Sequence, residues 1–414
     1  SDVYKRQLPA SAYFLDTPLH PVPPHGGAST FLMPGEPLLQ TVRASAQGVA
    51  AAAHLPVRAD AVDAFLRAVD AGKYEALRQQ HGIALPLRFD SFAEEVNLLS
   101  VLSLLNAFSG YRDEFHQATQ QGAFDNVRRL VLSLFLTRHD DGSSSLSAQA
   151  LQQLRPGAVA SALGVSMHRE EQHPTLSFVT VGTRNAPLNP VLELIAQTCN
   201  AAGAFVAQQG CADLGTFVLQ AAEQALQSEQ PESAFLRRML AVPGFDDVCS
   251  VDGHPVYLMK KALFLFYTLL QRAEQAAATD GAARRLAERA ADGRLVASLP
   301  MFVDNVIPTM LVHFGILDTA DTSVAPIRGW RADRSDGKRT GPVLEKQDAY
   351  RVRGAALHAG QCVVARAHEI ATEEGRQFLA SMREVDLDGY LWSLAKEPAF
   401  RSIPRLAEKG TCMY

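Results

Sequence analysis

Apolar residues recur along most of the chain at intervals of three and four positions, which is the spacing of one face of an α-helix. The clearest stretches lie near residues 98–105, 191–198 and 259–270. Runs that alternate between apolar and polar residues, as in half-buried strands, are scarce. We therefore predict an all-α fold with at most a small β-hairpin. The positions that form these helical faces are Leu98, Val101, Leu102, Leu105, Val191, Leu194, Ile195, Thr198, Met259, Ala262, Leu263, Phe266, Leu269 and Leu270.

The best strand signal lies at residues 248–258. There the dipeptide Asp252-Gly253 separates two short apolar segments, and Asp-Gly favours the tight turn of a β-hairpin. A helical pattern begins directly afterwards, near Lys260. We predict a hairpin that leads into a helix.

The polar segments predict how the chain is organised. Residues 1–35 are rich in proline and glycine, which is typical of an irregular tail. Residues 36–414 carry the helical pattern, interrupted by an Ala/Arg/Glu-rich stretch near 273–294 and a Gly/Asp/Arg/Pro-rich stretch near 318–346. We expect both insertions to be exposed, the first as helix and the second as a long loop or lid. Because neither an internal repeat nor an interdomain linker is evident, we predict a single helical domain after the tail.

The composition restricts the possible partners. The chain has 414 residues, of which 47% are hydrophobic, and a formal net charge of −5. That length and apolar content suffice for a large core. Polymeric nucleic acid is not expected as a partner, because binding a long phosphate backbone requires a basic excess. A single nucleotide needs only one or two cations and remains compatible with this charge.

Cysteine usage and the apolar runs indicate the compartment. The cysteines are odd in number, scattered, and never form a Cys-x-x-Cys pair, which is typical of a reducing compartment. The longest apolar runs, Tyr257–Leu270 and Leu299–Leu317, are interrupted by Lys260, Lys261 and Asp304, so we expect no membrane span. The first residues contain no apolar signal core, and we expect a cytoplasmic protein. The five cysteines are Cys199, Cys211, Cys249, Cys362 and Cys412.

Several common catalytic motifs are absent. The sequence contains no Gly-x-x-x-x-Gly-Lys loop, Gly-x-Gly-x-x-Gly fingerprint, Gly-x-Ser-x-Gly elbow or His-Glu-x-x-His pair, which excludes most nucleoside-triphosphate, dinucleotide, serine-hydrolase and zinc-protease functions. His168 and His173 could suggest a metal site, but a spacing of five residues does not place both on one helix face. With Pro174 directly after them, a solvated loop is the better interpretation, and we expect no metal site.

One acid stands in an otherwise apolar stretch. Asp304 lies near the middle of Leu299–Leu317, and burying an unpaired carboxylate costs several kcal/mol. The acid could cap a helix over Val306–Phe314, with Pro308 in the first turn. It could also serve a function, and the two roles are compatible because a cap would hold the carboxylate rigidly at a pocket wall.

Two adjacent lysines mark the second informative segment. Lys260 and Lys261 fall at the predicted start of a helix, where positive charge opposes the helix dipole. A phosphate bound at that N-terminus would offset the repulsion. Two solvated lysines are an equally open interpretation.

Short motifs from about residue 37 to the last residue follow the order found in one known family. They are Leu38-Leu39-Gln40-Thr41-Val42-Arg43, Glu94-Glu95-Val96-Asn97, Gly215-Thr216-Phe217, Phe245-Asp246-Asp247, Met259-Lys260-Lys261-Ala262, Phe302-Val303-Asp304-Asn305-Val306-Ile307-Pro308, Asp388-Gly389-Tyr390-Leu391-Trp392 and the final Tyr414. In this order they resemble the queuosine salvage protein family, the queuosine 5′-phosphate N-glycosylases. No single motif is decisive, but their order is.

The resemblance implies a fold and an activity. The implied fold is a single all-helical domain akin to the helix-hairpin-helix DNA glycosylases. The implied reaction is hydrolysis of queuosine 5′-monophosphate to queuine and ribose 5-phosphate, after which queuine can be reinserted into tRNA. Neither a metal nor an organic cofactor is needed for this reaction.

The implied substrate decides which chemistry is possible. A purine leaving group is normally activated by protonation at N7, but a 7-deazapurine has carbon there. Catalysis must therefore act on the sugar, where a carboxylate beneath C1′ can stabilise an oxocarbenium-like transition state and orient the attacking water. Asp304 matches the acid of the family motif, and we expect it to be the catalytic carboxylate.

The remaining motif positions suggest contacts to the substrate. We assign Asp247 to the base or its cyclopentenediol, because a carboxylate accepts hydrogen bonds from vicinal hydroxyls and amino groups. Lys260, with Lys261 second, is assigned to the 5′-phosphate. Tyr390 and Trp392 could wall the base by stacking, although helix-core packing explains Trp392 equally well. The other positions that the resemblance places at the substrate are Phe217, Asn305 and Tyr414.

The chain also departs from the family pattern. Asn305-Val306 replaces a Tyr-Arg pair, residues 349–353 lack two acids, and Gln361 stands in the region of a later glutamate. Two alternatives therefore stay open. The protein could be a catalytically impaired helical protein that binds a nucleotide or modified base, or a scaffold in which Asp304 is only a cap. A pocket shared by Asp304 and Lys260 would argue against the scaffold.

Overall fold

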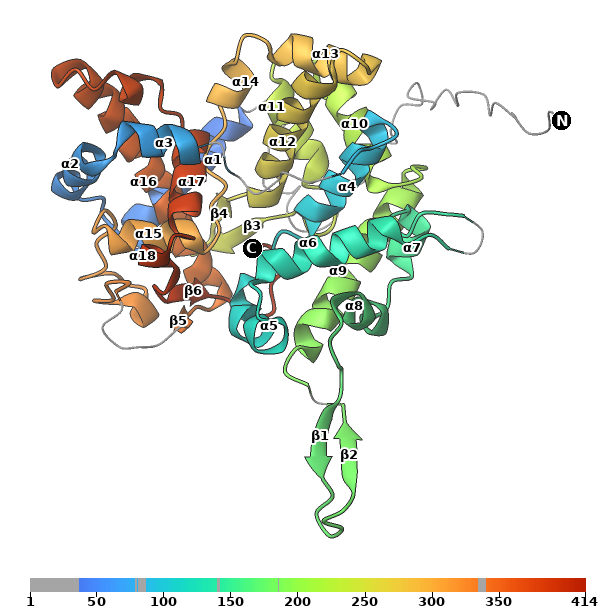
Figure 1. Cartoon of the computed structure of the whole chain (residues 1–414). Helices are drawn as coiled ribbons and strands as arrows, with labels where there is room; N and C mark the ends of the chain where they lie inside the picture. The colour runs from blue at the N-terminus through green and yellow to red at the C-terminus, as the bar shows by residue number, and fades with distance from the viewer. Residues whose placement is uncertain (1–36, 79, 81–86, 140–141, 185, 334–339) are drawn as a thin grey trace.

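The computed structural model describes residues 37–414 except 79, 81–86, 140–141, 185 and 334–339 (Figure 1). The predicted tail at 1–35 lies outside the described residues. The described chain is mostly helical, as predicted. The α-helices are α1 Leu38–Ala52, α2 Ala59–Ala68, α3 Ala71–Leu77, α4 Phe92–Leu104, α5 Arg112–Thr119, α6 Ala123–Leu136, α7 Ala148–Gln152, α8 Pro156–Leu163, α9 Asn189–Gln208, α10 Leu214–Ala225, α11 Pro231–Met239, α12 Lys260–Ala276, α13 Gly281–Ala290, α14 Arg294–Ala297, α15 Val306–His313, α16 Lys346–Glu373, α17 Glu384–Leu394 and α18 Pro398–Arg401.

Short strands and 3-10 turns complete the fold. In the described part of the chain the strands form three two-stranded sheets, whereas the sequence predicted at most one small hairpin. β1 with β2 and β3 with β4 are antiparallel, whereas β5 and β6 are parallel. The strands are β1 Arg169–Gln172, β2 Thr180–Thr183, β3 Val248–Val251, β4 His254–Tyr257, β5 Thr340–Val343 and β6 Arg405–Ala407, and the 3-10 turns are η2 Ser109–Tyr111, η3 Ala325–Ile327 and η4 Gln377–Ser381.

The predicted hairpin before α12 is present. β3 pairs with β4 with Val251 opposite His254, and Asp252 and Gly253 form the turn with φ of 51° and 83°. Positive φ at both central residues is the geometry that Asp-Gly favours in a two-residue hairpin loop. The second hairpin, β1–β2, was not predicted and extends away from the helical body in Figure 1. Its strands are exposed, and they carry His168 and His173 at their margins.

The helices pack around two long core elements. α12 contacts α4, α11 and α13, and all but a few of its side chains are buried. α16, with 28 residues, contacts α1, α2, α15 and α17. In Figure 1 the C-terminus lies in the middle of the molecule, and the carbonyl of Cys412 near it accepts from Lys261 of α12. The kinship with helix-hairpin-helix DNA glycosylases stays a prediction, as does the division into a tail and a single domain.

One helix among the described residues is long and apolar enough to cross a membrane, namely α9. This helix was not singled out from the sequence as a candidate span. Within the fold, 56% of its most apolar window is buried, and α9 packs against α7, α8 and α10. These contacts are those of a core helix.

Two of the motifs that resemble the family meet where α4 packs against α10. The backbone amide of Gly215 donates to Oδ1 of Asn97 at 3.1 Å. A Cβ atom on Gly215 would lie 2.5 Å from the backbone of Asn97, so only glycine allows this approach. Phe217 is fully buried beside them, with its ring 5.6 Å from that of Phe205. These motif residues hold helices together.

The two predicted insertions differ in burial. Residues 273–294 contain the end of α12 and all of α13, which exposes most of its surface and buries Ala283 and Leu286. The described part of the second, 318–333 and 340–346, differs from the exposed loop expected. Thr322 and Ile327 are fully buried, and the hydroxyl of Thr322 donates to the carbonyl of Ala53 at the end of α1. A few well-placed residues therefore anchor this polar segment.

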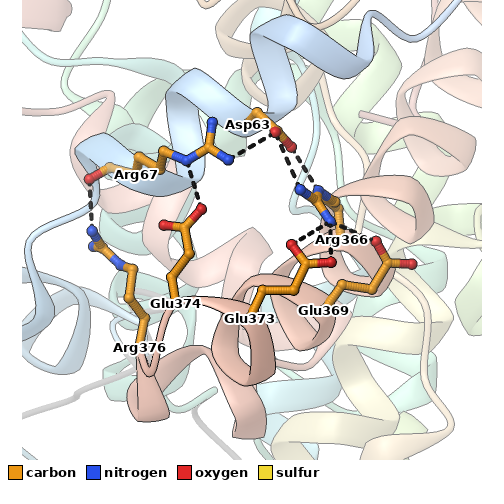
Figure 2. Close-up of polar contacts among 7 residues, drawn as sticks. All are labelled: Asp63, Arg67, Arg366, Glu369, Glu373, Glu374 and Arg376. Carbon is orange, nitrogen blue, oxygen red and sulfur yellow. Dashed lines mark hydrogen bonds and ion pairs between the residues drawn. The ribbon is translucent and has the colours of Figure 1, made fainter.

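A surface network of ion pairs joins α2 to the end of α16 (Figure 2). Nε of Arg366 lies 2.6 Å from Asp63, and the same guanidinium pairs with Glu369 and Glu373. Arg67 pairs with Asp63 and with Glu374 beyond the end of α16. These side chains are 25% to 61% exposed.

Candidate active site

A pocket of about 280 Å³ contains most of the predicted site. Its wall combines residues 106–112 after α4, the first turn of α6, the first residue of α12, the segment before α15, and the chain from the end of α17 to Tyr414. Asp304 and Lys260 both line it. The arrangement therefore argues against a scaffold in which Asp304 faces a closed interior.

Asp304 is at once a helix cap and a pocket residue. Its Oδ1 accepts the backbone amides of Val306 at 2.7 Å and Ile307 at 3.2 Å, which fixes the start of α15. The residue is 9% exposed and lines the pocket. Within the described residues, Oδ2 has no hydrogen-bond partner. The cap predicted from the sequence is present, and the same side chain lies at the pocket wall, where a functional carboxylate would have to be.

The segment that carries Asp304 is held from two sides. The amide of Phe302 donates to Oδ2 of Asp388 on α17 at 2.9 Å. The carbonyl of Val303 accepts two bonds from Arg353 on α16, at 3.1 and 2.9 Å. Burial raises the pKa of Asp388 well above its ordinary value, and the charge of Asp304 adds to this effect.

Lys260 places a desolvated cation in the same pocket. It is the first residue of α12, after Met259 in the left-handed region with φ of 49°. Its ammonium donates to the carbonyl oxygen and to Oδ1 of Asn106, at 2.6 and 3.1 Å. Burial lowers its pKa to about 8, an effect that the charge of Asp304 opposes. The lysine predicted to be solvated or anion-binding is therefore buried and partly engaged.

Further cations give the pocket a positive character. Among the described residues that line it, five are cationic and two acidic. The Lys396 ammonium lies 3.1 Å from the centroid of the Trp392 ring, and burial of this group lowers its pKa to about 8. Burial also lowers the pKa of Arg405 to about 10. The cations are Arg112, Lys260, Lys396, Arg401 and Arg405, and the acids are Asp125 and Asp304.

Aromatic rings complete the wall. Trp392 packs edge to face against Phe124, with centroids 5.8 Å apart and planes at 84°. Both rings and Tyr414 line the pocket. Asn305 also lines it, but its amide donates to the carbonyl of Leu406 at 2.8 Å, so it links the Asp304 segment to β6. The predicted positions Trp392, Tyr414 and Asn305 thus lie at the pocket.

Asp247, which was predicted to contact the base, does not line this pocket. The residue is completely buried. Its Oδ1 accepts from the Tyr350 hydroxyl and from Arg353, and its Oδ2 accepts from Arg353 and from the amide of Lys260. Burial alone raises the pKa of Asp247, but the charge and hydrogen bonds of Arg353 and the other donors outweigh it, and the pKa lies below its usual value. Neither oxygen is left for a ligand.

Three other predicted contacts also lie outside the pocket. Lys261 is fully buried, and its ammonium donates to the carbonyls of Leu104 and Cys412 at 2.8 and 2.6 Å. Phe217 belongs to the contact between α10 and α9. Tyr390 packs in the core against Tyr74, at 5.4 Å between centroids. All three side chains are buried in the core, away from the pocket lining.

The structure adds pocket residues that sequence reasoning missed. Lys396 follows Trp392 by four residues, a helical spacing at which a cation can reach an aromatic ring, and this signal was available. Arg112, Arg401 and Arg405 reach the pocket only through tertiary packing and carry no comparable local signal. Within the described residues, no group of three His, Cys, Asp or Glu side chains is placed to hold a metal ion.

Fold and site together define a helical protein with a positively charged, aromatic-walled pocket that contains one rigidly held carboxylate. Residues 189–411 match the family model described as queuosine salvage protein, and this range covers more than half of the chain. The chain therefore belongs to the queuosine salvage protein family, and membership supports a role in queuine salvage. No curated protein matches it.

Proposed function

We propose that the protein is an N-glycosidase that hydrolyses queuosine 5′-monophosphate to queuine and ribose 5-phosphate. The observation that carries this proposal is the placement of Asp304 and Lys260 in one pocket with further cations and aromatic rings. Family membership narrows the substrate to a queuosine-related small molecule. Each part of the nucleotide then has a matching part of the wall.

The sugar is the part that Asp304 would serve. Two backbone amides hold Oδ1, so the carboxylate is oriented without substrate and its second oxygen can face the anomeric carbon. As the C1′–N bond lengthens, the negative charge stabilises the positive charge on the ribose. Water then forms the new C1′–O bond, and its proton leaves through the carboxylate to the departing base.

The phosphate and the base take the remaining wall. A 5′-phosphate is a dianion near neutral pH, and five cationic side chains line this pocket. Lys396 and Arg401 are the best candidates for direct contact, because Lys260 and Arg405 already donate to protein oxygens. Trp392 and Phe124 offer ring surface on which a deazapurine can stack.

The test is incubation with queuosine 5′-monophosphate and detection of free queuine and ribose 5-phosphate by mass spectrometry. Asp304→Asn keeps the oxygen that caps α15 but removes the charge, so we expect turnover to fall by about 10²- to 10⁴-fold with the fold intact. Asp280→Asn is the matched control. Asp280 also caps a helix through two amides, those of Ala282 and Ala283, and it lies outside the pocket.

Two results would contradict the proposal. Full activity of Asp304→Asn would remove the acid from the mechanism. Tight binding of the nucleotide by calorimetry, with no turnover by the wild-type protein, would instead make this chain a nucleotide-binding protein. The departures at Asn305 and Val306 motivate that alternative.

A further inference from the structure

One buried ion pair touches three different parts of the pocket wall. Asp247 and Arg353 have side chains that are 0% and 2% exposed, and their closest charged atoms are 2.7 Å apart. They come from the residue before β3 and from the middle of α16, which are separated by 106 positions. Neither residue lines the pocket itself.

Arg353 contacts the residue before Asp304 and the ring of Tyr414. Its Nε and one terminal nitrogen donate to the carbonyl of Val303, directly before Asp304, while its two terminal nitrogens bind Asp247. The guanidinium carbon lies 4.2 Å from the centroid of the Tyr414 ring, which lines the pocket. Only a planar, forked cation can bond a carboxylate and a carbonyl in this way while stacking on a ring.

Asp247 holds the backbone of another pocket residue, Lys260. Its Oδ2 accepts the amide of Lys260, the first residue of α12. Its backbone carbonyl accepts the amides of Leu258 and Met259. The residue thereby fixes the turn from the β3–β4 hairpin into α12, and with it the point from which the Lys260 side chain enters the pocket.

We propose that the Asp247–Arg353 pair is a positioning device that holds Asp304, Lys260 and Tyr414 in a fixed mutual arrangement. The catalytic consequence rests on the function proposed above, whereas the structural consequence does not. A buried ion pair is often no more stabilising than an apolar pair of similar volume. Its location at the meeting point of three wall segments is what a positioning role requires.

The matched test compares two arginines of the same helix. Arg353→Lys keeps a positive charge beside Asp247 but cannot reproduce the four forked hydrogen bonds that the guanidinium makes to the carboxylate and the Val303 carbonyl. Arg366→Lys makes the same chemical change 13 residues further along α16, in the surface network of Figure 2. Both variants are compared with the wild-type protein for turnover, for melting, and for amide hydrogen exchange by mass spectrometry.

We expect Arg353→Lys to lower kcat by about 10- to 100-fold while KM changes by less than about threefold, because a small misplacement of a reacting group costs turnover more than binding. Amide exchange should accelerate at residues 302–307 and 258–260, where the pair holds the backbone, and should stay unchanged in α10. Arg366→Lys should leave kcat, KM and these amides as in the wild-type protein.

The outcomes separate this proposal from the proposed function. If the wild-type protein shows no turnover, the function fails, and the exchange experiment still tests the positioning role. Exchange and kcat that match the wild type in Arg353→Lys overturn the positioning role. Acceleration spread evenly over the chain, including α10, also overturns it, because that result indicates general destabilisation.

A milder variant covers the case in which Arg353→Lys does not fold. Tyr350→Phe removes only the hydroxyl that donates to Asp247 at 2.7 Å. We expect kcat to fall by about 2- to 10-fold, with faster exchange confined to the same two segments. Wild-type kcat and wild-type exchange in this variant would overturn the positioning role.

Discussion

Two arginines of α16, Arg353 and Arg366, form ion pairs in opposite surroundings. Arg353 is 2% exposed and bonds one carboxylate and one carbonyl in the core. Arg366 is 26% exposed and forms ion pairs with three carboxylates at the surface (Figure 2). Hydrogen bonds to Asp63 and neighbouring acids raise the pKa of Arg366, while burial opposes the rise that Asp247 causes in the pKa of Arg353.

The difference shows that the number of ion pairs does not measure their importance. Exposed pairs gain little because water screens them and long side chains lose entropy. A buried pair costs desolvation, but removing one partner leaves an uncompensated charge in the core. The denser network at the surface should therefore be the more dispensable one, and the isolated pair in the core should control both stability and the site.

The largest effect should come from removing the buried cation. Arg353→Met replaces the guanidinium with an apolar chain and leaves the Asp247 carboxylate buried without its main partner. We expect the free energy of unfolding to fall by about 3–5 kcal/mol, measured by urea denaturation. A change below about 1 kcal/mol would contradict the contrast between the two regions.

The double variant Asp247→Leu with Arg353→Met serves as the control for that result. Because it removes both charges, it should recover at least half of the lost stability. It should not recover turnover, since the Val303 carbonyl and the Lys260 amide still lack their partners. Recovery of both would mean that the pair contributes to stability alone.

The pocket lysines should make substrate capture depend on pH, unlike the surface arginines. Burial lowers the pKa values of Lys260 and Lys396 to about 8, below the ordinary 10.5. As the pH rises through about 8 these ammonium groups lose their protons, so kcat/KM for the 5′-monophosphate should fall. The effect on folding has the opposite sign. Between about pH 8 and 10.5 the two lysines are neutral in the folded protein and charged in the unfolded chain, so the free energy of unfolding should increase as the pH rises through this range.

A profile of kcat/KM against pH checks this expectation. Lys396→Arg should move the decline to higher pH, because arginine stays protonated. The nucleoside queuosine, which lacks the phosphate, should show a weaker decline. A profile that stays flat to pH 9.5 would show that the two ammonium groups do not bind the phosphate.

The smallest effect should come from the surface network. Arg366→Ala removes a side chain that pairs with Asp63, Glu369 and Glu373, yet we expect the melting temperature to fall by about 2 °C or less. The difference should shrink further in 1 M NaCl, where exposed charges are screened. A loss as large as that of Arg353→Met would reverse the ranking of the two regions.

The fold was predictable wherever local chemistry determines it. Helical periodicity located α4, α9 and α12, and Asp252-Gly253 located the β3–β4 turn. Asp304 stood out in the sequence because an acid in an apolar stretch must be a cap, have a partner or serve a function. The structure shows that it caps α15 and lines the pocket. These features depend on neighbours in the chain.

The interior partners were not predictable in the same way. Asp247 was assigned to the base because the family motif has an acid there and a carboxylate can accept hydrogen bonds from the base, whereas its partner Arg353 lies 106 positions later. Lys261 was predicted to bind the phosphate or to be solvated, because the sequence does not show that its partners are two backbone carbonyls from distant segments. Residue type and sequence spacing do not show which charged side chain is buried in the core and which one lines a pocket.

The contact between Lys396 and Trp392 also gives the native protein an intrinsic fluorescent probe of its pocket. The chain contains two tryptophans, and the indole of Trp392 has an ammonium group 3.1 Å from its ring centroid at the pocket wall. Indole emission responds to a neighbouring charge, so the arrival of an anion or the loss of a proton at Lys396 alters the light that Trp392 emits. Replacing Trp330 would isolate that signal and allow occupancy to be followed in real time without a label.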